Sequence, residues 1–110
     1  YRLPRTARRA ALASALSQKA RDGQVRVIDA LRLDQPKTKR MQEILATLGI
    51  NGSVLIVGRG EDRNLELSAR NIPYTRVMTV AGLNVYDVLR HEILLIQRDA
   101  LPVIEERLSR

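Results

Sequence analysis

Two groups of basic side chains give this sequence its clearest potential for chemistry, and that chemistry is phosphate binding. Their members stand at the starts of two expected helices: Arg5, Arg8, Arg9, Lys37, Lys39 and Arg40. The helix dipole disfavours a cation in a first turn, by about 0.3–1 kcal/mol at an exposed site. No acid shares either first turn. We therefore expect an external polyanion to neutralise these charges, with the free amides at the helix starts as additional donors.

Four further residues complete the expected contact set: Arg2, Lys19, Asn84 and Tyr86. Arg2 and Lys19 are expected as secondary phosphate contacts. Asn84 and Tyr86 follow the third expected strand and add polar or stacking contacts. Asn84 is also placed to cap a short helix. For Tyr86, packing in the core is an equal alternative, because one aromatic residue does not make a stacking platform for bases.

The segment Gly58-Arg59-Gly60 follows a strand and precedes a helix, which is the position of a dinucleotide-binding loop. The third glycine of that motif is absent, because Arg63 occupies its place. Glu61 and Asp62 would also repel a pyrophosphate. We interpret the segment as an ordinary strand-to-helix turn with acids at a helix start. A Rossmann-like domain that binds a small ligand or nucleotide remains the alternative function.

Catalytic and metal-binding groups are scarce. His91 is the single histidine, and without a second imidazole or a cysteine we expect it at the surface or in an interface. Asp29 ends an expected strand, but Gln97-Arg98 stands where a phosphoacceptor site would need a lysine. Asp87 is expected to serve the first turn of its own helix. We therefore predict no enzymatic activity, no cofactor and no metal.

The apolar pattern predicts an alternation of helices and strands that would position these residues. Helices are expected over residues 7–22, from Thr38 as the cap to Gly49, and over 63–70, 84–90 and 99–108; strands are expected over 25–28, 54–57, 76–80 and 93–96. Arg70-Asn71-Ile72-Pro73 is expected to stop a helix, with Asn71 suited to a left-handed cap. Strict alternation predicts an α/β fold, a three-layer α/β/α sandwich around a four-stranded parallel sheet, as one domain over residues 1–110.

The excess charge is concentrated in the first part of the chain. The net charge is +7 and the isoelectric point is about 10.8. Residues 1–40 hold eleven basic and three acidic residues, whereas the remaining seventy hold eight and nine. In an α/β sandwich, helix starts collect at the carboxyl edge of the sheet, so we expect both basic groups on one surface, with Arg107 and Arg110 far from it. A polyanion is the expected partner.

Two absences limit the class of protein further. The chain has no cysteine, which excludes disulfides and thiolate metal sites and fits a reducing cytoplasm. It has no run of about 18–20 apolar residues, so we expect no membrane partner. A basic protein–protein adaptor is a third, weaker possibility.

Five motifs follow one another without large gaps from Tyr1 to about Leu108. They are Leu3-Pro4-Arg5 continuing through Arg8-Arg9-Ala10-Ala11-Leu12 to Ala15-Leu16-Ser17, then Pro36-Lys37-Thr38-Lys39, Val54-Leu55-Ile56-Val57, Leu65 with Ser68-Ala69-Arg70-Asn71, and Gly82-Leu83-Asn84-Val85-Tyr86-Asp87 with Leu89. Together they resemble the globular part of the bacterial large-subunit ribosomal protein four family. The last two motifs are specific individually, and the ordered set is more specific still.

The resemblance implies a fold and a set of partners. It implies strand order 1-4-2-3, binding to large-subunit (23S) ribosomal RNA, contact with neighbouring large-subunit ribosomal proteins, and a cytoplasmic location on the ribosome. For some members of the family it also implies binding to their own messenger RNA. The family has an N-terminal segment and a long extended loop, and we expect this chain to start where that loop returns.

Overall fold

A four-stranded parallel sheet forms the centre of the molecule. The computed structural model describes residues 5–29, 31 and 33–109. The strands are β1 (Val25–Ile28), β2 (Val54–Gly58), β3 (Thr75–Thr79) and β4 (Ile93–Gln97), in the order β1-β4-β2-β3. Every neighbouring pair is parallel. The expected parallel sheet and its strand order are both confirmed.

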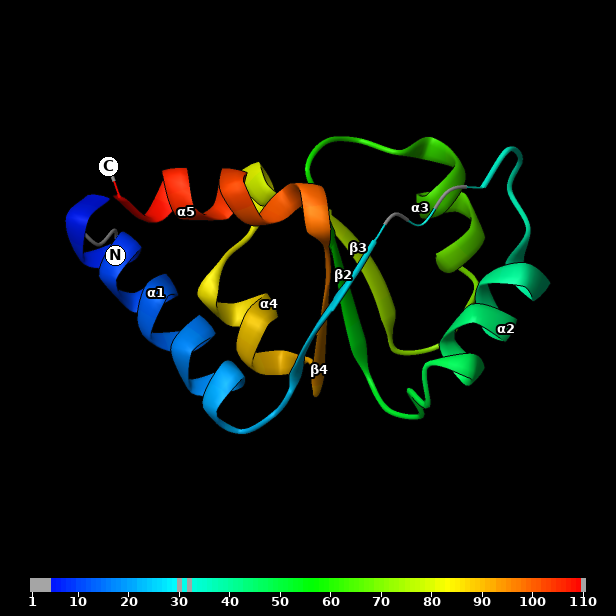
Figure 1. The fold of residues 1–110 in the computed structure, drawn as a ribbon, viewed down its shortest axis with the longest axis horizontal. Helices are drawn as coiled ribbons and strands as arrows, with labels where there is room; N and C mark the ends of the chain where they lie inside the picture. Colours follow the sequence, from blue (N-terminus) through cyan, green and yellow to red (C-terminus); the bar gives the residue numbers. More distant parts are fainter. Residues whose placement is uncertain (1–4, 30, 32, 110) are drawn as a thin grey trace.

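Helices cover the sheet on both faces, which confirms the three-layer arrangement (Figure 1). On one side lie α1 (Arg5–Arg21), α4 (Val85–Arg90) and α5 (Leu101–Ser109). On the other side lie α2 (Thr38–Thr47) and α3 (Arg63–Ala69). Two short 3-10 turns, η1 (Val80–Gly82) and η2 (Arg98–Ala100), follow β3 and β4. No helix in the described ranges is long and apolar enough to cross a membrane.

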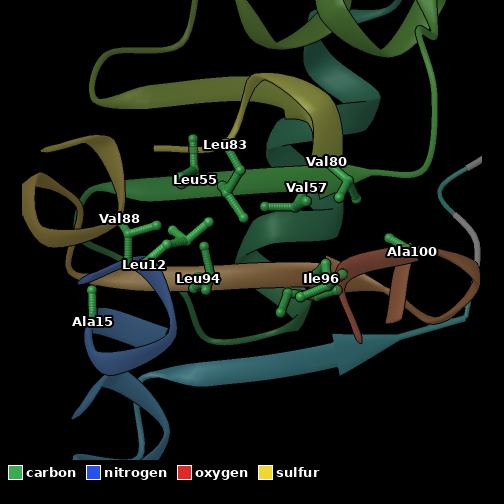
Figure 2. Close-up of a cluster of buried hydrophobic side chains, with 11 residues drawn as sticks. Leu12, Ala15, Leu55, Val57, Val80, Leu83, Val88, Leu94, Ile96 and Ala100 are labelled. Carbon is green, nitrogen blue, oxygen red and sulfur yellow. The ribbon is translucent and has the colours of Figure 1, made fainter. Parts of the chain in front are cut away.

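Each face of the sheet has its own apolar core. In Figure 2, Leu12 of α1 and Val88 of α4 meet Leu55 and Leu94 of the two central strands. On the opposite face, side chains of α2 and α3 pack on the other side of the same strands. All five residues of β2 are buried, as expected for a central parallel strand covered on both faces. These two cores decide which helix starts lie on which side.

Two expected caps differ from the structure. The N-cap of α2 is Lys37, and Thr38 is the first helical residue. The Lys37 side chain makes no cap hydrogen bond. Its backbone amide donates to the Ser68 hydroxyl of α3 at 2.8 Å, which anchors the residue just before the helix. Asn71 does not take up the left-handed conformation; Tyr74, with a φ of 62°, does so instead. The helix stop itself is confirmed, since α3 ends at Ala69.

The last helix takes an unexpected direction. It begins beyond η2, with Pro102 as its second residue, and α5 then runs outward from the sheet to the first turn of α1 (Figure 1). A crossover helix in a parallel sheet normally lies along its strand, but α5 leads to no further strand in the described chain. The C-terminal end of α5 lies beside the start of α1.

Candidate nucleic-acid interface

A groove lies between α1, the η1–α4 segment and α5. It has a volume of about 890 Å³. Five arginines line it: Arg5, Arg8, Arg9, Arg59 and Arg107. They come from three separate segments: the start of α1, the turn after β2 and the last turn of α5. We call this feature the arginine groove.

Most of these arginines have no protein partner for their charge. Among the described residues, no carboxylate pairs with Arg5, Arg8, Arg9 or Arg59. Arg107 differs, because its Nη1 donates to the Val80 carbonyl at 2.6 Å and so ties α5 to η1. Four unpaired guanidinium groups around one groove create a positive potential that favours a polyanion.

Tyr86 also lines the groove, and its side chain is available to a ligand. The residue is 68% exposed, so packing in the core, one of the two expected roles, is excluded. The guanidinium of Arg90, one turn further along α4, lies 5.8 Å from the centre of its ring. This cation–π contact holds the ring while leaving it open to solvent.

Asn84 lies at the same groove, but its polar groups are already used. Its Oδ1 accepts from the Asp87 amide at 2.9 Å, which confirms the expected helix cap. Its Nδ2 donates to Oδ2 of Asp87 at 2.7 Å and to the Gly82 carbonyl at 3.3 Å. The side chain of Asn84 therefore shapes the turn that carries Tyr86, and we do not retain it as a direct RNA contact.

Lys19 is not an accessible phosphate contact. It is 7% exposed, and its Nζ donates to the carbonyls of His91 and Glu92 and to Oε1 of Gln24. These carbonyls follow the end of α4, where a cation is favourable. The expectation for Lys19 is corrected: its charge is taken up by the protein itself. Arg2, the other secondary expectation, lies outside the described residues.

The second basic group, Lys37, Lys39 and Arg40, is exposed at the start of α2. We call it the α2 cluster. Arg40 forms an ion pair with Glu43 at 3.5 Å, but both side chains are more than half exposed, so the pair contributes little. Asn64 of α3 donates to the carbonyls of Leu33 and Asp34, and Ser68 binds the Lys37 amide. Asn64 and Ser68 of α3 thus fix the position of the loop that carries the α2 cluster.

The expectation that both basic groups share one surface is not met. Both helix starts lie toward the carboxyl edge of the sheet, but α1 and α2 pack on opposite faces. In Figure 1 they stand at opposite ends of the longest axis. Arg107 was expected to be remote, yet it lies in the arginine groove. The geometric reason is the outward direction of α5.

Sequence reasoning also missed Arg59 as a member of the groove. It lies in the Gly58–Gly60 segment, whose glycines are typical of a dinucleotide-binding loop and do not indicate a phosphate contact by Arg59. The position of that segment was informative, since residues following any parallel strand reach the carboxyl edge. The residues around Arg59 and Arg107 in the sequence do not predict that either arginine lies beside α1.

The Gly58–Gly60 turn itself does not favour a nucleotide. An open depression there is lined by the acids Glu61, Asp62 and Asp99. Oδ1 of Asp62 accepts from the Leu65 amide at 3.1 Å, so this side chain caps α3 as expected for an ordinary turn. Arg59 and Arg63 also line it, so the three carboxylates outnumber the basic side chains and would oppose a pyrophosphate. The alternative nucleotide-binding function receives no support from this geometry.

The remaining titratable candidates have structural partners. His91 is buried rather than at the surface, and its Nδ1 lies 2.8 Å from the Asp87 carbonyl. Asp29 pairs with Arg98 at 3.1 Å in an exposed position. Within the described residues, no three histidine, cysteine, aspartate or glutamate side chains are grouped to hold a metal ion.

A parallel α/β sandwich with unpaired arginines over a groove defines a class of basic binding proteins, and comparison with known sequences gives the family. The chain matches the model of the ribosomal protein L4/L1 family over residues 1–107, so it belongs to that family. This agrees with the resemblance carried by its five motifs.

Curated relatives named large ribosomal subunit protein uL4 are similar over nearly the whole chain. The relative from Moorella thermoacetica is 46% identical over 109 residues, covering 99% of this chain and 53% of the relative. Those from Pelotomaculum thermopropionicum and Thermoanaerobacter sp. (strain X514) are 47% and 43% identical, each covering 96% of this chain and 51% of the relative. The chain spans about half the length of the curated relatives it matches.

Proposed function

We propose that this chain is a structural constituent of the large ribosomal subunit that binds 23S ribosomal RNA mainly through its phosphates. The observation that carries the proposal is the arginine groove, where four unpaired guanidinium groups from two segments surround one concave surface. Arg5, Arg8, Arg9 and Arg59 provide the charge, and Tyr86 adds a contact. Binding gains from the release of counterions held by the RNA.

The α2 cluster forms a second, separate phosphate contact in this proposal. Lys37, Lys39 and Arg40 are exposed at the start of α2, which packs on the opposite face of the sheet from α1, so they engage a different part of a folded RNA. The 110 residues act as one RNA-binding unit, because the two helical layers share the same central strands. The role is architectural, and the proposal includes no reaction.

Further partners follow from the ribosomal location. Neighbouring large-subunit proteins are expected beside the RNA, and the ribosome places the chain in the cytoplasm. Its own messenger RNA offers the same phosphate chemistry, and no contact among the described residues distinguishes the two RNAs. The relatives' printed names refer to the large ribosomal subunit, which supports ribosomal RNA as the partner in this proposal.

Salt-dependent binding to large-subunit ribosomal RNA tests the proposal. Replacing Arg5 and Arg8 with alanine should weaken binding and flatten the log–log salt slope by up to about 0.9 per lost phosphate contact. The matched control replaces Arg21 and Arg70, exposed arginines at the ends of α1 and α3, and should leave the affinity nearly unchanged. Equal losses in both variants would contradict a specific role for the groove.

A further inference from the structure

The arginine groove has an apolar floor as well as a basic rim. Leu12, Val80 and Leu83 line it, together with the half-buried Val85 and Val103. Figure 2 shows the first three with the core side chains of this face of the sheet, so the floor of the groove is continuous with the core. The exposed ring of Tyr86 stands beside this floor.

Regular double-stranded RNA would leave these apolar surfaces unused. An A-form helix presents phosphates and 2′-hydroxyls, and its stacked bases are not available to an aromatic side chain. An unpaired nucleotide offers both kinds of contact at once: charged phosphates at its ends and a flat apolar face on its base. The volume of about 890 Å³ lies in the range of pockets that hold small organic ligands.

We infer that the arginine groove accepts a single unstacked nucleotide of the RNA, with its base against Tyr86 and the apolar floor and its flanking phosphates at the arginines. The inference rests on the proposed function and adds to it the class of RNA, one with a bulged or looped-out residue. The contact with Arg90, at 5.8 Å, holds the Tyr86 ring before the base arrives.

Charge favours RNA over a protein segment as the occupant. The groove is lined by five arginines and one glutamate, Glu106. A peptide would need several acids spaced around an apolar side chain to match it. Every nucleotide of an RNA strand combines negative charge with an apolar surface, since a phosphate lies on each side of its base.

Two RNA probes test the inference: a short fully paired duplex and the same duplex with one bulged adenosine. The wild-type chain should bind the bulged RNA about five- to tenfold more tightly, at the lower end of the effect of base–aromatic stacking. Tyr86→Leu should reduce this preference to near unity, whereas Tyr86→Phe should retain it. The control Tyr74→Leu alters a tyrosine that is 80% exposed and outside the groove, and should keep the preference.

Ultraviolet crosslinking gives an independent readout. Trypsin separates the two described tyrosines, because Tyr86 falls in the peptide of residues 77–90 and Tyr74 in that of residues 71–76. The bulged RNA should crosslink to the first peptide and not to the second. Circular dichroism of Tyr86→Leu should match the wild type, since the side chain is exposed.

The outcomes separate this inference from the proposed function. If Arg5→Ala/Arg8→Ala weakens both RNAs equally and no bulge preference exists in the wild type, the base site is refuted while phosphate binding stands. If the arginine changes affect neither RNA, the proposed function fails as well. Stronger competition by an acidic, leucine-containing peptide than by bulged RNA would assign the groove to a protein partner and overturn the inference.

Discussion

At the scale of single residues, equal charges on α1 have different roles because their burial differs. Arg8 is exposed and unpaired at the start of the helix, whereas Lys19 is buried and bound to backbone carbonyls. The sequence contained a signal for this difference. Lys19 stands four and seven residues after Ala15 and Leu12, which places it on the apolar face of the helix. Counting basic residues alone could not separate the two.

Replacing Lys19 and Arg8 with methionine should therefore have opposite effects. Lys19→Met removes the donor for two carbonyls and should lower the free energy of unfolding by about 2 kcal/mol, leaving RNA affinity unchanged. Arg8→Met should leave stability unchanged or slightly higher, because it removes a cation from a helix start, and should weaken RNA binding. Urea unfolding and RNA titration of both variants measure this. A loss of affinity in folded Lys19→Met would restore Lys19 as a contact.

At the scale of elements, the six-residue α4 depends on contacts around its first turn. Oδ1 of Asn84 caps the Asp87 amide, and Nδ2 of Asn84 donates to Oδ2 of Asp87. Oδ1 of Asp87 also pairs with Nη1 of Arg76 on β3 at 3.0 Å. The carboxylate is 5% exposed, while the Arg76 side chain is 54% exposed. The sequence predicted the cap, but the pairing with Arg76 depends on the distance between β3 and α4 in the folded sheet.

Asn84→Ala should lower the free energy of unfolding by about 1–2 kcal/mol, the usual cost of losing an N-cap. Asn84→Ser should recover most of the loss, because serine also caps helices. The matched control is Asn71→Ala, which alters an exposed asparagine beyond the end of α3. Thermal and urea unfolding give the comparison. Equal stability of Asn84→Ala and Asn71→Ala would show that the cap does not hold this segment.

The loop before α2 depends on α3 in a similar way. Ser68 is fully buried; its hydroxyl accepts from the Lys37 amide and donates to the Asn64 carbonyl at 2.6 Å. Ser68→Ala should cost about 1 kcal/mol of stability and speed hydrogen exchange at the Lys37 amide. Ser17→Ala, on the exposed face of α1, is the control and should change neither quantity appreciably. Unaltered exchange at Lys37 in Ser68→Ala would contradict the role assigned to the hydroxyl.

At the scale of the whole molecule, the sequence predicted the layers better than their surfaces. Apolar runs such as residues 54–57 predicted the strands, and apolar periodicity with capping residues predicted the helices. The family resemblance implied the strand order. Periodicity does not say which face a helix covers. The placement of α1 and α2 on opposite faces, and the outward path of α5 that brings Arg107 to the groove, depend on the three-dimensional path of the chain.

This two-sided arrangement makes the two basic groups independent. Arg5→Ala/Arg8→Ala and Lys39→Ala/Arg40→Ala should each weaken binding to large-subunit ribosomal RNA, and their free-energy losses should add to within about 0.5 kcal/mol because the sites share no partners. With a short RNA duplex that cannot reach both faces, the wild-type chain should bind two duplexes and each variant one. Isothermal titration gives both the affinities and the stoichiometry. One duplex bound by the wild type, with strongly non-additive losses, would mean that both groups hold the same stretch of RNA.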